Sequence, residues 1–411
     1  MNLLRTIIRT YREAYSGLPK EAWMLSLVEL INRSGTMVIF FMTLYLTRKL
    51  GYSIPQAGQA MSAFGFGALG GSYLGGKLSD TMGAYKVQRY SLFLTGFSLI
   101  FLGHLANFLL ILAAMFILGL VTETLHPANA TAMSQVCPVH LRTRGFALNR
   151  LATNLGVTIG PVIGGFLALH NYKSLFWVDG LTCLIAGLVF WYYFRTDRPE
   201  FIHREEGVPV NRSPLKDWYF LKMMGAVFLM ALVFMQMFST FPLYYNEFYG
   251  FLENHIGFLL SINTIIIVLF EMILINRLRK VSPFTIVAVG GLLLAGGFGL
   301  IPLGRGFLYA AFTVTVWTVG EMLFMPALTT LIANLSDDAS RGKYMGMFSF
   351  AFSLAFIVGP YLGSYVYEEV SPHLLWMFCG IIGVLLLVIF LWLKHTAPDR
   401  VTQTGQQLEN V

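Results

Sequence analysis

Apolar stretches of about 20 residues recur along the whole chain, and they constrain its fold more than any other feature. Each stretch is long enough to cross the hydrocarbon core of a bilayer. Backbone exposed to lipid must satisfy its own hydrogen bonds, so only helices and closed barrels can span a membrane. The stretches are continuous and lack the alternation of barrel strands. The sequence therefore predicts an all-α membrane protein, in agreement with a charged fraction of only 12%.

The apolar stretches predict twelve transmembrane helices in two six-helix bundles. Their approximate ranges are 23–46, 55–78, 88–106, 108–134, 145–169, 174–194, 218–246, 254–277, 283–303, 307–334, 343–367 and 373–394. Most of the 28 lysines and arginines lie in the termini and in the loops after even-numbered spans. The positive-inside rule then places both termini in the cytoplasm. The net charge of +7 is explained by this topology, so we expect the lipid bilayer and no nucleic acid as a partner.

A polar segment divides the chain into two similar halves. We expect an amphipathic cytoplasmic helix over 1–22, a six-helix bundle over 23–194, a cytoplasmic linker over 195–217, a second bundle over 218–394 and a cytoplasmic tail over 395–411. Identical residues recur at a constant offset of 199, for example Gly160-Pro161 and Gly359-Pro360. Such parallel six-span repeats are an architecture of secondary transporters.

Charged side chains inside the spans indicate a watered interior. Glu29 and Arg33 lie four residues apart in the first span, on one helical face and close enough to pair. A charge at the bilayer centre costs at least about 2.5–3.5 kcal/mol, so such residues face a protein interior or an aqueous cavity. The pattern favours a transport pathway between helices. The residues alone leave open a structural ion pair that fixes helix packing.

Two stretches carry a family resemblance. Residues 76–86 resemble the motif between spans two and three of the major facilitator superfamily, and residues 156–165, GVTIGPVIGG, resemble the span-five motif of its drug:proton antiporter branch. The chain is thereby identified as a member of this superfamily over nearly its whole length. The resemblance implies two bundles that alternate access to a central cavity lined by spans one, four, seven and ten.

The resemblance also selects candidate site residues. A buried carboxylate favours its protonated form unless a cation lies nearby, which is the physical basis of proton coupling. The predicted proton-coupling residues are Glu29, Arg33, Glu123 and Glu321. The predicted substrate-binding residues are Asn32, Arg33, Thr36, Phe40, His126, Gln236, Phe241, Asn263 and Trp317. The predicted conformational residues are Gly76, Asp80, Gly83, Lys86, Arg150, Gly156, Gly160, Pro161, Gly164, Glu271, Gly359 and Pro360.

These features predict a proton-coupled secondary active transporter that exports drug-like or amphipathic molecules as a monomer in the bacterial inner membrane. Phosphate loops, nucleophile motifs and paired histidines are absent from the sequence, and the three cysteines lack metal-ligand spacing, so we expect no enzyme activity, cofactor or metal. Residues 29–33 partly resemble the span-one signature of proton-dependent peptide transporters. An importer of peptides or other small metabolites therefore remains an alternative, as do a lysophospholipid or siderophore carrier and a receptor that does not transport.

Overall fold

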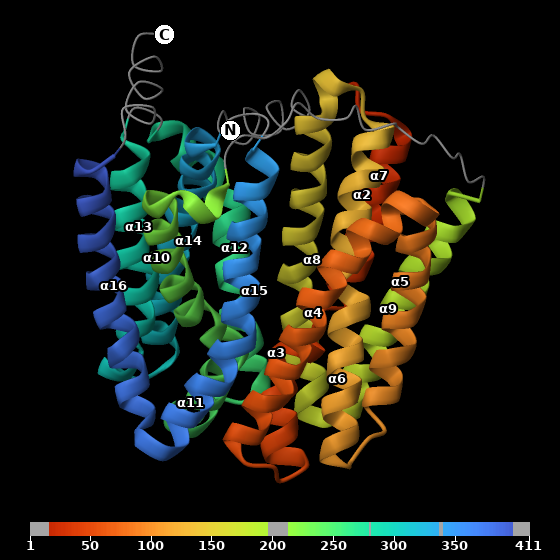
Figure 1. The fold of residues 1–411 in the computed structure, drawn as a ribbon. Helices are drawn as coiled ribbons and strands as arrows, with labels where there is room; N and C mark the ends of the chain where they lie inside the picture. Colours follow the sequence, from red (N-terminus) through yellow and green to blue (C-terminus); the bar gives the residue numbers. More distant parts are fainter. Residues whose placement is uncertain (1–15, 196–212, 279–280, 337–339, 398–411) are drawn as a thin grey trace, which may run out of the picture. The chain divides into compact units, whose positions relative to one another are not determined.

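The computed structural model describes residues 16–195, 213–278, 281–336 and 340–397, and every regular element in these ranges is helical (Figure 1). Most of the predicted N-terminal helix, linker and C-terminal tail lies outside the described residues. The α-helices are α2 (Lys20–Ser34), α3 (Val38–Leu44), α4 (Ile54–Met82), α5 (Ala84–Leu102), α6 (Phe108–Glu123), α7 (Leu125–Val136), α8 (Arg142–His170), α9 (Tyr172–Tyr193), α10 (Trp218–Met235), α11 (Thr240–Tyr249), α12 (Glu253–Arg277), α13 (Pro283–Gly299), α14 (Phe307–Leu335), α15 (Arg341–Tyr365) and α16 (Pro372–His395). The short or wide helical turns are η1 (Tyr45–Lys49), η2 (Val139–Leu141), η3 (Pro214–Lys216), η4 (Gln236–Phe238), η5 (Ile301–Leu303) and η6 (Val366–Val370).

The helices confirm the predicted all-α membrane architecture. Within the described ranges, nine helical segments are long and apolar enough to cross a membrane, and α13 is a shorter apolar helix of 17 residues. Helices α4 and α5 are also long, at 29 and 19 residues, but they are not among these segments. The count of twelve spans in two bundles therefore stays a prediction.

Contacts between residues divide the chain into two compact units. Unit 1 comprises Met1–Val38 and Phe66–Ile202, and unit 2 comprises Ile39–Gly65 and His203–Val411. The predicted boundary at the linker assigned the first two spans entirely to the first bundle, whereas the contacts assign Ile39–Gly65 to unit 2.

Polar contacts join residues 39–65 to the remainder of unit 2. Arg48 Nη2 lies 3.2 Å from Glu247 Oε1, and Tyr367 donates its hydroxyl hydrogen to Glu247 Oε2 at 2.8 Å. At the start of α4, the Ile54 backbone N–H donates to Glu368 Oε2 at 2.9 Å. These contacts neutralise charges and satisfy a helix terminus within unit 2.

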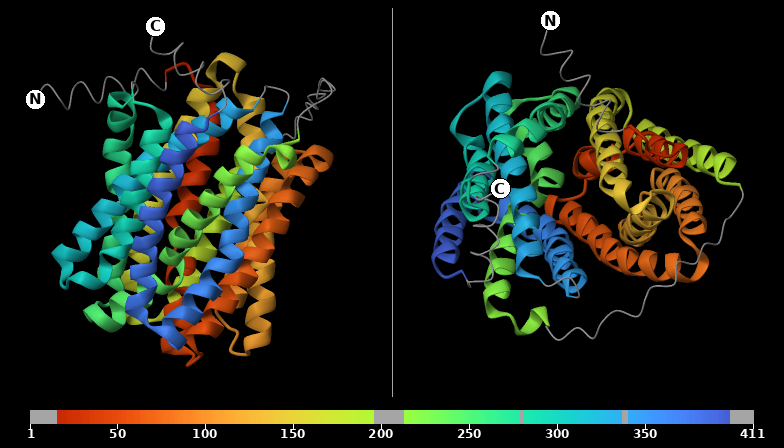
Figure 2. Two further views of the ribbon diagram at one scale, coloured as in Figure 1. Left: turned by 60° about the vertical axis from the view of Figure 1, so that its left-hand side comes forward. Right: turned by 90° about the horizontal axis from the view of Figure 1, so that it is seen from above.

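Small residues allow the helices of unit 1 to approach closely. Helix α2 packs against α8 and α9, and α5 packs against α9 (Figure 2). A Cβ atom on Gly160 of α8 would lie 2.7 Å from the Thr36 carbonyl oxygen and 3.3 Å from that of Arg33. Only glycine therefore permits this approach of the two backbones, as expected for helix packing in membranes.

The same contact recurs in unit 2 at the predicted offset of 199. A Cβ on Gly359 of α15 would lie 3.0 Å from Met235 Cβ and 3.5 Å from the Leu232 carbonyl oxygen of α10. Leu232, Met235 and Gly359 stand 199 positions after Arg33, Thr36 and Gly160. The pair α2 and α8 and the pair α10 and α15 thus pack in a similar way. Side chains at corresponding positions of the two pairs can therefore be compared.

A pair of glycines on α4 provides a test of this close packing. A Cβ on Gly67 would overlap the Phe116 carbonyl oxygen of α6, whereas nothing lies within 4 Å of a Cβ on Gly76. We expect Gly67→Ala to lower stability by about 1–3 kcal/mol, the usual cost of overpacking. Gly76→Ala should be neutral or slightly stabilising, because alanine favours helices over glycine. Thermal unfolding in detergent measures both, and equal melting temperatures would contradict the predicted contact.

Candidate functional site

The centre of the candidate site is an ion pair on α2. Arg33 Nε donates to Glu29 Oε1 at 2.8 Å, one helical turn apart. Both side chains are largely buried, with 13% of the Arg33 side chain and 5% of the Glu29 side chain exposed. A buried charge is tolerated when it is paired and hydrogen-bonded. The negative charge of Glu29 is therefore compensated by Arg33 inside unit 1.

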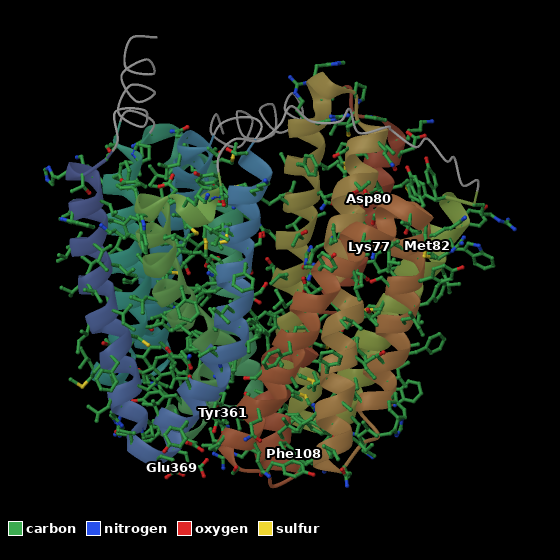
Figure 3. All side chains as sticks on the ribbon, viewed as in Figure 1. Lys77, Asp80, Met82, Phe108, Tyr361 and Glu369 are labelled. Atoms are coloured by element: carbon green, nitrogen blue, oxygen red, sulfur yellow. The ribbon has the colours of Figure 1, made fainter. Side chains whose placement is uncertain are left out.

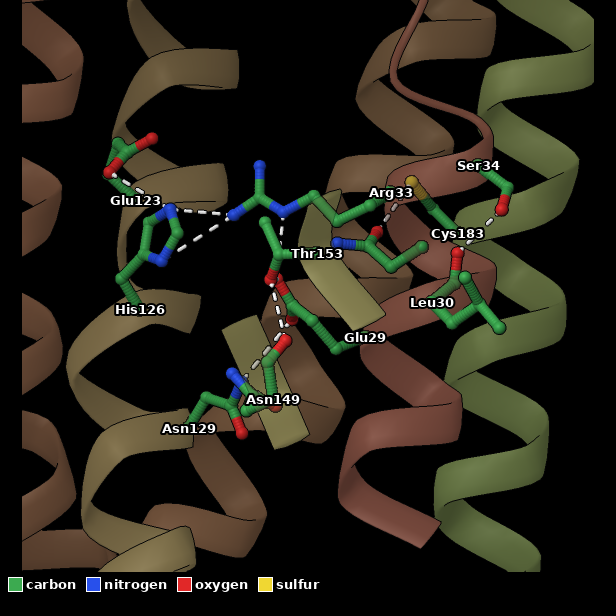
Figure 4. Close-up of polar contacts among 11 residues, drawn as sticks. Glu29, Leu30, Arg33, Ser34, Glu123, His126, Asn129, Asn149, Thr153 and Cys183 are labelled. Carbon is green, nitrogen blue, oxygen red and sulfur yellow. Dashed lines mark hydrogen bonds and ion pairs between the residues drawn. The ribbon is translucent and has the colours of Figure 1, made fainter. Parts of the chain in front are cut away.

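Two further donors from other helices complete the shell of Glu29 (Figure 4). Thr153 Oγ1 of α8 donates to Glu29 Oε1 at 3.2 Å, and Asn129 Nδ2 of α7 donates to Oε2 at 3.3 Å. Asn129 Nδ2 also lies 3.3 Å from Asn149 Oδ1. The sequence analysis missed Asn149 and Thr153 as site residues. Their spacing of four on α8, directly before the glycine stripe that contacts α2, is the signal that places them together.

His126 links the ion pair to Glu123. Arg33 Nη2 lies 2.6 Å from His126 Nε2, and the same Nε2 lies 3.8 Å from Glu123 Oε2 (Figure 4). An arginine can only donate, so Nε2 must accept and the neutral ring carries its proton on Nδ1. The His126 and Glu123 side chains are 49% and 25% exposed, so they form the accessible edge of the cluster. We call Glu29, Arg33, Glu123 and His126 the charged cluster.

Two further predicted ligands on the first span, Asn32 and Thr36, contribute to packing. Asn32 is buried, and its Oδ1 accepts a hydrogen bond from Cys183 Sγ of α9 at 3.3 Å. Thr36 lies in the turn after α2, where its carbonyl oxygen faces Gly160. The structure therefore uses both residues to hold the α2 backbone in place.

Unit 2 contains a second carboxylate with an amide partner. Asn263 Nδ2 of α12 donates to Glu321 Oε2 of α14 at 2.9 Å and lies 3.1 Å from Thr318 Oγ1. Asn263 and Thr318 are buried. The structure thus brings together two residues predicted separately, Asn263 as a ligand and Glu321 as a proton site.

The remaining predicted ligands of unit 2 lie in packed surroundings. Trp317 is fully buried and stacks on Phe298 at a ring distance of 5.2 Å, and Phe241 packs edge-on against Tyr245. Phe40 stacks on Phe238 at 5.2 Å. The Gln236 amide donates to the carbonyl oxygens of Leu232 and Gly359, each at 3.0 Å, and accepts from Thr240 Oγ1 at 2.9 Å. It thereby fastens the turn between α10 and α11.

The predicted conformational residues are spread over several helices, and their roles stay predictions. Asp80 is exposed at the end of α4 near Lys77 (Figure 3), and Gly83 adopts a φ of 90° before α5, which carries Lys86 in its first turn. Arg150 is exposed on α8, whereas Glu271 is buried on α12. The remaining residues of this set lie within α4, α8 and α15: Gly76, Gly156, Gly160, Pro161, Gly164, Gly359 and Pro360.

The repeat places apolar residues where unit 1 carries the charged cluster. The residues 199 positions after Glu29, Arg33, Thr153, Glu123 and His126 are Phe228, Leu232, Phe352, Met322 and Met325. Three of these, Phe228, Leu232 and Phe352, pack in one apolar cluster around Met235 and Ala355. The shared backbone arrangement is therefore compatible with apolar side chains at these positions. Unit 2 thus forms the corresponding helix contact with apolar side chains at these positions.

A polytopic helical membrane protein with ionisable side chains held inside its helices has the features of a membrane transporter. A family model described as "Major Facilitator Superfamily" matches residues 25–336 and 307–410. The chain belongs to this superfamily of transporters, as the sequence motifs predicted.

Similar proteins include transporters of several kinds. The chain is 24% identical over 357 residues to the uncharacterised transporter YqjV of Bacillus subtilis (strain 168), covering 83% of this chain and 85% of that protein. It is 23% identical over 360 residues to multidrug resistance protein 2 of the same organism, covering 83% and 87%. A solved structure of a POT family transporter with a thioalcohol-conjugated peptide is similar in fold, with a TM-score of 0.77, 16% identity and coverage of 94% and 98%.

Proposed function

We propose that this protein is a proton-coupled secondary active transporter that exports drug-like or amphipathic small molecules by alternating access. The observation that carries the proposal is the difference between the two halves. The corresponding helix contact carries the charged cluster in unit 1 and apolar residues in unit 2. Because intramembrane charge is costly, the charged cluster at positions that are apolar in the other half favours a function in the transport cycle.

The geometry of His126 suggests how a proton takes part in that cycle. The neutral imidazole accepts from Arg33 through Nε2. A proton bound to Nε2 removes this acceptor and places two cations side by side. The same Nε2 then finds a carboxylate partner in Glu123, whose Oε2 is 3.8 Å away. Proton binding thus exchanges the partner of His126 and releases the Arg33 Nη2 donor.

The charge balance of the cluster favours a cationic substrate. With His126 neutral, the cluster holds two carboxylates and one guanidinium, and Glu29 is already neutralised by Arg33. Glu123 therefore supplies the uncompensated negative charge, and a proton or the cationic group of a substrate neutralises it. The relation to a multidrug resistance protein agrees with export of such compounds. We further propose twelve spans, cytoplasmic termini, a bacterial inner membrane location and a monomeric state.

Transport by purified protein in proteoliposomes tests this function. With an acidic lumen, the wild-type protein should accumulate a fluorescent amphipathic cation in exchange for protons. His126→Gln keeps a hydrogen-bonding side chain but cannot gain a proton, so its proton-driven flux should fall. Probe movement that is independent of the pH gradient in the wild type would refute proton coupling.

Import of peptides is the second candidate. Its support is the partial span-one resemblance at residues 29–33 and the Arg33 guanidinium, a group that can bind a carboxylate through paired donors. Vesicles with the gradient reversed, so that the medium rather than the lumen is acidic, distinguish the two functions. Proton-driven accumulation of a labelled dipeptide, without movement of the cationic probe, would favour the importer. Binding of either compound without flux would instead indicate a receptor.

A further inference from the structure

The first span is broken directly after Arg33, and a carboxylate from another span holds the break. Helix α2 ends at Ser34, Gly35–Met37 form a turn, and α3 begins at Val38. The backbone N–H groups of Met37 and Val38 both donate to Asp179 Oδ2 of α9, each at 3.1 Å. Asp179 is only 5% exposed. Its carboxylate satisfies two donors that the interrupted helix leaves without intrahelical partners.

Neighbouring contacts fix the backbone on both sides of Arg33. One turn beyond Asp179 on α9, Cys183 donates to Asn32. A Cβ on Gly35 would overlap Thr182 Oγ1, so the turn lies directly against α9. On the other side, a Cβ on Gly156 of α8 would lie 2.9 Å from the Arg33 carbonyl carbon. Arg33 is thus held between α8 and α9. Asp179 secures the C-terminal end of α2, which directly follows Arg33.

In the second half, an amide side chain makes the hydrogen bonds at the corresponding break. Its seventh span is also interrupted, at η4 between α10 and α11, and the side chain of Gln236 within the break makes the hydrogen bonds there. The residue 199 positions after Asp179 is Phe378, which is 48% exposed. Among the described residues, the Asp179 carboxylate thus bonds the break in unit 1, whereas the Gln236 amide bonds the break in unit 2.

We propose that Asp179 is a positioning residue: by holding the break of the first span, it sets the Arg33 guanidinium against His126. Val38, whose backbone N–H donates to Asp179, is the last residue of unit 1 before the chain continues into unit 2 at Ile39. The charged and titratable groups that act on Asp179 are Arg33 of α2 and Cys183 of α9. The effect on transport rests on the proposed function, whereas the contact itself does not.

Three variants separate positioning from charge. Asp179→Asn keeps an oxygen that can accept from both N–H groups, so its flux should stay within about threefold of the wild type and its pH profile should be unchanged. Asp179→Ala removes the acceptor, so flux should fall by about tenfold or more and the pH profile should change, because small displacements of a positioned group have large effects on rate. Leu181→Ala, at an exposed position of the same helix, should resemble Asp179→Asn.

Hydrogen–deuterium exchange of the Gly35–Leu44 segment in the full-length protein tests the contact without transport. Exchange should be faster in Asp179→Ala and unchanged in Asp179→Asn and Leu181→Ala. Unchanged exchange in Asp179→Ala, or an unchanged pH profile of its flux, would overturn the proposal. If Asp179→Ala does not fold, Asp179→Asn decides alone, since a changed pH profile there would show that charge is required. Wild-type vesicles without proton-driven flux would refute the proposed function, while the exchange experiment would still test the contact.

Discussion

Arg33→Met should be the most destabilising single substitution in the charged cluster and should abolish transport. Methionine preserves much of the side-chain length but leaves Glu29, which is 4% exposed, without its cation. Removing one partner of a buried ion pair costs about 3–5 kcal/mol, because the other charge stays buried and uncompensated. Thermal unfolding in detergent and proton-driven flux in proteoliposomes measure the two effects.

The matched control is the double variant Glu29→Gln with Arg33→Met. Glutamine retains an oxygen that can accept from Thr153 and Asn129, and the pair is replaced by neutral groups of similar volume. Such replacements are often neutral or stabilising. The double variant should therefore recover most of the lost melting temperature while remaining inactive. Recovery of transport together with stability would reduce the pair to a structural role.

Glu123→Gln should reduce proton-driven flux by about 10²-fold or more, the scale at which positioned proton-transfer groups act. The glutamine cannot ionise, so a protonated His126 loses its carboxylate partner and the cationic substrate loses its counter-charge. Protein yield and melting temperature should change little, because this side chain is 25% exposed. Flux of a fluorescent amphipathic cation under a pH gradient is the measurement.

Two comparisons sharpen this result. Glu321→Gln should also reduce flux, because it removes the charge of the carboxylate to which Asn263 donates in unit 2. Glu369→Gln, at an exposed position of η6, should behave like the wild type. Full activity of both Glu123→Gln and Glu321→Gln would exclude these carboxylates from proton coupling. Loss of activity in Glu369→Gln would show that the assay responds to any change of charge.

The sequence predicted the helical membrane architecture and the family because both depend on local signals. Apolar length defines the spans, and the spacing of Gly156 and Gly160 places a close helix contact on α8. The four-residue spacing of Glu29 and Arg33 likewise predicts their pairing without tertiary information. These inferences needed only helical periodicity and the cost of burying charge.

The remaining parts of the site depend on contacts between distant helices. Thr153 and Asn149 lie four residues apart on α8, but only the approach of α8 to α2 brings them to Glu29. Asp179 is not among the residues that the sequence selects for the site, yet it holds the turn after Arg33. The assignment of Ile39–Gly65 to unit 2 also depends on tertiary contacts such as the Arg48–Glu247 pair.

The glycine contact shared by Gly160 and Gly359 has a consequence for how this protein can be altered. Since the backbone approach is made by residues without side chains, the neighbouring positions are free to differ in chemistry between the halves. Natural or laboratory evolution can therefore change ligand preference by editing one copy of the duplicated module, while the other copy preserves the scaffold.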